Sequence, residues 1–142
     1  MTTVEETTQS NPLTEGLERL PIRPTTMTIF GATGDLARRK LLPALYNLAH
    51  EGQLPERFNL IGVSRSDMPD EDYQQQAREA IEQFSRRETD AKVLDGLLAN
   101  VAYVSGTFDE PDLYDRLGER VAKLDDDADV PFNRMYYLSR AP

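Results

Sequence analysis

Two residue types that often mark a catalytic or metal-binding centre, cysteine and histidine, are absent or scarce in the sequence. It contains no cysteine, which excludes disulfides and thiolate chemistry, and it contains a single histidine. That histidine, His50, precedes Glu51-Gly52 at the expected end of a helix, so it is interpreted as a C-terminal capping residue. General-base catalysis needs a group within hydrogen-bond reach of the substrate, and nothing in the sequence singles out a side chain for that role. The sequence therefore predicts no catalytic residue and no metal site in this chain.

Long apolar segments are also missing. Mean hydropathy is −0.58, and no apolar run approaches the ~20 residues that a membrane-spanning helix needs. The first residues, 1–12, have neither the basic nor the apolar part of a signal peptide. These absences predict a cytoplasmic protein without membrane contact.

Positive charge is scarce as well. The formal net charge is −9, which argues against nucleic acid as a partner because phosphate backbones are bound by clustered cations. Residues 26–65 are an exception, with five basic and three acidic residues. This basic segment is either the site of a bound anion or a set of ordinary solvated side chains, and charge alone does not separate the two readings.

The chain divides into a short leader and one domain. Residues 1–24 are polar and contain three prolines, so they are predicted to be a disordered leader. Residues 25–142 then form the domain. Strands are expected at 25–30, 58–64, 101–104 and 134–138. Helices are expected from about 36 to 50, over 70–86, over 91–98 and over 109–123, with 125–127 as a loop.

Alternating strands and helices predict an α/β fold, a Rossmann-like parallel sheet with helices on both faces, truncated after about four strands. Pro43 is expected to kink the first helix near residues 41–42, because proline lacks an N–H and crowds the preceding turn. In the doubly wound strand order the last expected strand lies at the edge of the sheet. An apolar edge strand predicts that the isolated chain aggregates or is only marginally folded.

The most informative motif lies at the first strand-to-helix turn. Gly31, Gly34 and Ala37 have the spacing G-x-x-G-x-x-A, which departs from the common G-x-G-x-x-G. Glycines here let the backbone approach a pyrophosphate, and the helix N-terminus offers N–H groups and a partial positive charge. The alternative is a plain turn. The nucleotide hypothesis names these candidate coenzyme-binding residues in the turn: Gly31, Ala32, Thr33, Gly34, Asp35, Leu36, Ala37 and Arg38.

The second clue is the end of the second expected strand. An NAD-binding fold places an acid there to hold the ribose 2′-OH, but this strand ends at Arg65 between Ser64 and Ser66. A guanidinium can bind a 2′-phosphate with paired, charge-assisted hydrogen bonds, so Arg65 is a candidate site residue and NADP is the expected cofactor. Two alternatives stay open. Asp67 is close enough to hold the ribose instead, and Arg65 can be an ordinary surface arginine.

The run of residues 31–45, GATGDLARRKLLPAL, resembles the opening of glucose-6-phosphate dehydrogenases. Further similarity covers residues 61–66, 100–106 and 134–139, so the resemblance extends over residues 26–142. It implies that the turn residues line the coenzyme phosphates and that Arg65 contacts the 2′-phosphate of NADP. The chain is therefore interpreted as an N-terminal coenzyme-binding fragment of this family.

The resemblance also implies the reaction of the whole enzyme. That family oxidises glucose 6-phosphate to 6-phosphogluconolactone in the oxidative pentose phosphate pathway, using a histidine in a downstream R-I-D-H-Y-x-G-K motif. This motif and the E-K-P-x-G motif are absent here, so the chain alone is expected to be inactive. The full-length enzyme is expected to bind glucose 6-phosphate and to be a homo-oligomer. The fragment is expected to do neither. A stand-alone NADP-sensing module and a remnant that binds nothing are the competing hypotheses.

Overall fold

The computed structural model describes residues 24–55, 57–107, 109–129 and 131–138, so the predicted leader lies almost wholly outside the described residues. The strands are β1 (Thr25–Phe30), β2 (Phe58–Ser64), β3 (Val101–Ser105) and β4 (Asn133–Leu138). The helical elements follow in chain order between them. They are η1 (Ala37–Leu41), α2 (Leu42–His50), α3 (Asp70–Phe84), α4 (Ala91–Leu98) and α5 (Pro111–Ala128).

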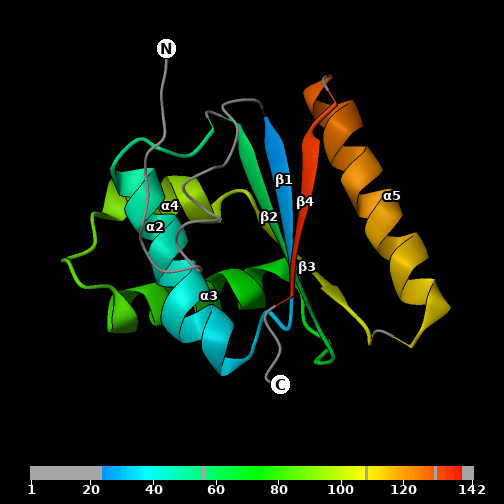
Figure 1. Cartoon of the computed structure of the whole chain (residues 1–142), viewed down its shortest axis with the longest axis horizontal. Helices are drawn as coiled ribbons and strands as arrows, with labels where there is room; N and C mark the ends of the chain where they lie inside the picture. Colours follow the sequence, from blue (N-terminus) through cyan, green and yellow to red (C-terminus); the bar gives the residue numbers. More distant parts are fainter. Residues whose placement is uncertain (1–23, 56, 108, 130, 139–142) are drawn as a thin grey trace, which may run out of the picture.

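The strands form one four-stranded sheet in the order β3-β2-β1-β4. Every pair is parallel, and β1 lies between β2 and β4. Helices cover both faces of this sheet: α2, α3 and α4 lie on one side and α5 lies alone on the other (Figure 1). The predicted Rossmann-like α/β fold is therefore confirmed, including the position of the fourth strand at an edge.

Successive side chains of a strand point to opposite faces of the sheet, so β1, β2 and β3 contribute to both apolar cores. Met27 and Ile29 of β1 point into the core shared with α2, α3 and α4. Phe30 of β1 and Val63 of β2 belong to the smaller core under α5. A parallel sheet covered on both faces needs apolar residues on both sides, which explains why β1 is buried along its whole length.

Pro43 changes the helix in the predicted place. The N–H of Leu42 bonds to the carbonyl of Ala37, five residues back, so the segment before the proline is a π-helix. An i−5 turn is wider than an α-turn, and a proline that donates no N–H is accommodated where the pattern widens. The helix ends at His50 with Glu51 as its C-cap, and the expected glycine, Gly52, follows with a φ of 70°. The predicted capping role of His50 is wrong: its ring lies against Arg87, with Nη1 to Nδ1 at 2.7 Å, and the N–H groups of Glu51 and Gly52 bond to the last carbonyls of the helix.

One predicted loop is wrong. Residues 125–127 belong to the last turns of α5, which runs to Ala128. Three consecutive aspartates oppose the helix dipole at this end, which is why the sequence suggested a loop. Specific partners offset that cost. The Asp125 carboxylate accepts the Phe132 N–H at 3.0 Å and pairs with Arg134 at 3.0 Å. Asp129 follows the helix as its C-cap and adopts a left-handed φ of 58°.

Two large apolar side chains of the edge strand β4 remain exposed to solvent. Tyr136 is 57% exposed and Leu138 is 64% exposed. Self-association of the isolated chain therefore stays the expected result in size-exclusion chromatography, and Leu138→Lys is expected to move material toward the monomer volume, because charge on an edge strand opposes pairing. A sharp monomer peak with cooperative melting of the unmodified chain would contradict this expectation.

Candidate functional site

A hollow lies at the carboxyl edge of the sheet. It has a volume of about 650 Å³. In open α/β sheets, ligands bind outside the carboxyl ends of the strands, so this is where a coenzyme is expected. The residues that line it come from the ends of β1, β2 and β3 and from the start of α5. They are Phe30, Gly31, Val63, Ser64, Arg65, Gly106, Thr107, Asp109 and Leu113.

The turn after β1 is tied to the end of β2. Gly31 has a φ of 82°, a conformation that glycine adopts without the steric cost of a side chain. Its N–H and that of Ala32 both donate to the carbonyl of Val63, at 2.8 and 3.0 Å. The N–H of Gly34 donates to the Gly31 carbonyl at 3.0 Å. These bonds fix the turn as a tight loop next to the hollow.

The helix begins directly after this turn. The N–H of Arg38 bonds to the Gly34 carbonyl at 3.1 Å. The N–H groups of residues 35–37 therefore precede the first intrahelical bond, where an anion can bind them. Ala37 is completely buried and lets the helix pack closely on the sheet, whereas Leu36 is 36% exposed.

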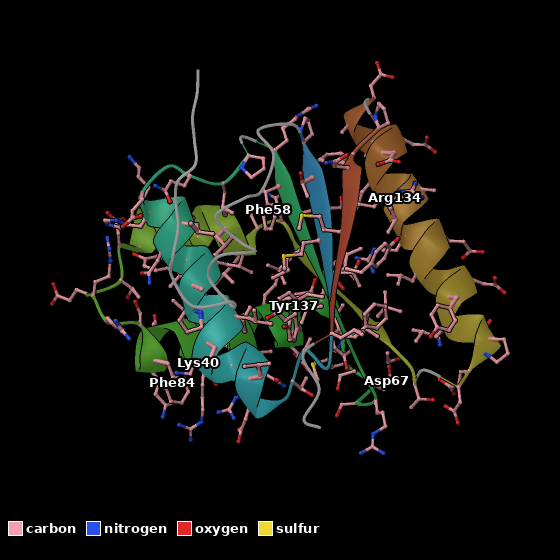
Figure 2. The ribbon with its side chains drawn as sticks, in the orientation of Figure 1. Lys40, Phe58, Asp67, Phe84, Arg134 and Tyr137 are labelled. Carbon is pink, nitrogen blue, oxygen red and sulfur yellow. The ribbon has the colours of Figure 1, made fainter. Side chains whose placement is uncertain are left out.

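The charged residues of the first turn partly neutralise one another. The Asp35 carboxylate lies 3.5 Å from the Arg38 guanidinium and 4.0 Å from that of Arg39. The Arg39 guanidinium also lies over the ring of Phe84, 4.9 Å from its centroid. Figure 2 shows Phe84 and Lys40 together on the helical layer formed by α2 and α3. Arg38 and Arg39 thus have partners within the protein.

Arg65 is exposed and lines the hollow together with Gly31. Among the described residues, no hydrogen bond or ion pair is assigned to its guanidinium. The hydroxyl groups of Thr33 and Ser64 lie 2.7 Å apart and link the glycine turn to the same strand end. Asp67, seen at this edge in Figure 2, accepts a long hydrogen bond of 3.4 Å from Ser105. The guanidinium is therefore available to a ligand.

The structure brings the predicted residues into one region but gives them different positions. Gly31 and Arg65 line the hollow, Ala32 and Ala37 are buried in the core shared with α2, α3 and α4, and the remaining predicted residues form the adjoining turn and helix start. The loop after β3 supplies a further wall of the hollow, which the sequence motifs did not indicate. Its residues are Gly106, Thr107 and Asp109. Their position after a third parallel strand is the signal that could have identified them.

Asp109 makes this wall acidic. The Thr107 hydroxyl donates to its carboxylate at 2.5 Å, and this hydrogen bond is the main reason that the pKa of Asp109 lies below its usual range. A negative charge here repels phosphate and favours a ligand's hydroxyl or amino groups. The described residues contain no cluster of side chains suited to a metal ion. Within the same residues, no helix is long and apolar enough to cross a membrane.

Comparison with known proteins identifies relatives over nearly the whole domain. The family model described as "Glucose-6-phosphate dehydrogenase, NAD binding domain" matches residues 28–142. Glucose-6-phosphate 1-dehydrogenase 2 of Mycobacterium tuberculosis (strain H37Rv) is 38% identical over 135 residues, which are 93% of this chain and 26% of that protein. The glucose-6-phosphate 1-dehydrogenase of Chlamydia muridarum is 40% identical over 120 residues, with 84% and 24% covered.

Solved structures agree with the sequence matches. A structure described as "Glucose-6-phosphate dehydrogenase in complex with its substrate glucose-6-phosphate" has a TM-score of 0.74 at 31% identity. The match covers 84% of this chain and 25% of that one. The enzyme from Mycobacterium avium gives a TM-score of 0.69 at 32% identity, with 84% and 24% covered. The chain spans about a quarter of the length of these relatives.

Proposed function

The chain belongs to the family of the glucose-6-phosphate dehydrogenase NAD binding domain, and from this premise we propose that it binds NADP through Gly31–Arg38 and Arg65. As part of a dehydrogenase, it would hold the coenzyme for the oxidation of glucose 6-phosphate to 6-phosphogluconolactone. Alone, it binds the coenzyme without catalysing that reaction. The observation that carries the proposal is the shared position of Gly31 and an exposed Arg65 on one hollow at the carboxyl edge of the sheet.

The shape and donors of the turn fit a pyrophosphate. Gly31 turns the chain in a left-handed conformation, and Gly34 places no side chain between the backbone and a ligand. The N–H groups of residues 35–37 then supply donors at the positive end of the helix. When bound, the coenzyme accepts a hydride from the substrate. The residues of this chain bind and orient it.

Arg65 gives the site its preference for NADP. A planar guanidinium matches two phosphate oxygens and remains charged at all physiological pH values. It stands after β2, where an NAD-binding fold carries an acid. A ribose 2′-phosphate on the coenzyme would meet this cation, while the adenosine would occupy the hollow between Arg65 and the loop after β3.

The proposal is tested by titrating the 142-residue chain with NADP⁺ and NAD⁺ in surface plasmon resonance. Immobilisation keeps the molecules apart, so self-association through β4 does not interfere. We expect saturable binding with NADP⁺ preferred by about tenfold or more, the value of one charge-assisted hydrogen bond. The ligand 2′,5′-ADP, which keeps the 2′-phosphate and lacks nicotinamide, is expected to compete with NADP⁺. Absence of binding to both coenzymes would favour a remnant that binds nothing.

A further inference from the structure

The loop that carries Arg65 is held from the end of β3. The carbonyls of the residues on both sides of Arg65 accept hydrogen bonds from that strand end. The Ser64 carbonyl accepts the Gly106 N–H at 2.8 Å. The Ser66 carbonyl accepts the hydroxyl of Tyr103 at 2.5 Å. Since peptide groups are planar, fixing the carbonyls on either side restricts the backbone from which the Arg65 side chain extends.

Tyr103 is well suited to this role because its own position is fixed. The side chain is 4% exposed, and burial raises the pKa of its hydroxyl, so the group remains a protonated donor at neutral pH. Its ring packs against that of Tyr73 at a centroid distance of 5.3 Å. Two tyrosines from α3 and β3 thus form one buried pair beneath the site.

The two hydroxyl groups of the pair point to different halves of the site. The Tyr73 hydroxyl donates to the Ala32 carbonyl in the glycine turn at 3.2 Å. The Tyr103 hydroxyl donates to the loop of Arg65 instead. One aromatic pair therefore supports the pyrophosphate turn with one hydroxyl and the 2′-phosphate loop with the other.

We propose that Tyr103 is a positioning residue for recognition of the 2′-phosphate, acting on Arg65 through the Ser66 carbonyl. This inference rests on the proposed function of the chain as an NADP-binding domain. It goes further by separating the two buried tyrosines: Tyr103 supports the preference for NADP that Arg65 provides, and Tyr73 serves the part of the coenzyme that NADP and NAD share.

The test compares Tyr103→Phe with its matched control Tyr73→Phe. Each variant keeps the ring packing and removes one hydroxyl. For Tyr103→Phe we expect the Kd for NADP⁺ to rise about fivefold, near the value of one neutral hydrogen bond, with the Kd for NAD⁺ unchanged. For Tyr73→Phe we expect equal effects on both coenzymes. Thermal melting of each variant shows whether the fold is retained.

A double-mutant cycle shows whether Tyr103 acts through Arg65. In an Arg65→Ala background, Tyr103→Phe is expected to have no further effect on NADP⁺ binding. Equal losses in both backgrounds, or equal losses for NADP⁺ and NAD⁺, would overturn the inference.

The same titrations separate failure of this inference from failure of the proposed function. If Arg65→Ala abolishes the preference for NADP⁺ and Tyr103→Phe leaves it intact, only the role of Tyr103 is refuted. If the unmodified chain shows no preference for NADP⁺, both are refuted.

Discussion

Replacing Arg65 with alanine is expected to raise the Kd for NADP⁺ by about 10- to 100-fold, since a hydrogen-bonded charge contributes roughly 1.5–3 kcal/mol. The Kd for NAD⁺ is expected to stay within about twofold, because NAD⁺ presents no phosphate to the guanidinium. Arg65 lies exposed on the hollow that also contains Gly31. The loss therefore appears only with the coenzyme that carries the extra phosphate. Surface plasmon resonance with both coenzymes measures it.

Arg86→Ala is the matched control for this substitution. Arg86 is also exposed, but it follows α3 and does not line the hollow, so the substitution removes the same charge away from the site. Its Kd values are expected to equal those of the unmodified chain. A preference for NADP⁺ that survives in Arg65→Ala would refute the role assigned to Arg65 and would leave Asp67 or another residue as the ribose ligand.

Gly62→Ala is expected to cause the largest loss of stability. A Cβ at position 62 would lie 2.6 Å from Cε2 and 2.7 Å from Cζ of Tyr73, and 2.9 Å from the Cβ of Ala32. Neither neighbour can withdraw, because Tyr73 is 1% exposed and Ala32 is completely buried. Overpacking in such a core costs about 3 kcal/mol. In urea unfolding, the midpoint is expected to fall with an unchanged slope.

Gly96→Ala is expected to change the stability of the chain in the opposite direction. Gly96 lies in α4, and a Cβ there would meet nothing within 4 Å. Alanine is favoured over glycine in a helix by about 0.8–1.0 kcal/mol, so this variant is expected to be slightly more stable than the unmodified chain. If Gly62→Ala melts like the unmodified chain, the close packing of β2 against Tyr73 is contradicted.

The sequence allowed the framework to be predicted because local patterns decide it. The strand at 25–30 and the helix at 91–98 have the predicted bounds. Pro43 affects only the adjacent turn of its own helix, so this effect was also predictable. The prediction of a loop at 125–127 was wrong because Asp125 is stabilised by Phe132 and Arg134, partners that only the fold brings near.

The site, too, could be predicted only in part from the sequence. Its glycine turn and Arg65 could be located from a strand–turn–helix pattern and from the end of the next strand. The acidic wall at Thr107 and Asp109 could not, because it depends on which loop the sheet places beside Arg65. The bond between Tyr103 and Ser66 spans 37 positions in the sequence and involves a backbone carbonyl. No local pattern marks such a contact.

Hydrogen–deuterium exchange of the chain at low micromolar concentration, with and without saturating NADP⁺, tests the central claim most directly. Binding across the glycine turn and Arg65 predicts slower exchange in peptides that cover residues 31–38 and 64–68. With NAD⁺, the protection is expected to persist in the first region and to weaken in the second. Protection confined to other parts of the chain, or no protection by NADP⁺, would contradict an NADP site at the carboxyl edge of this sheet.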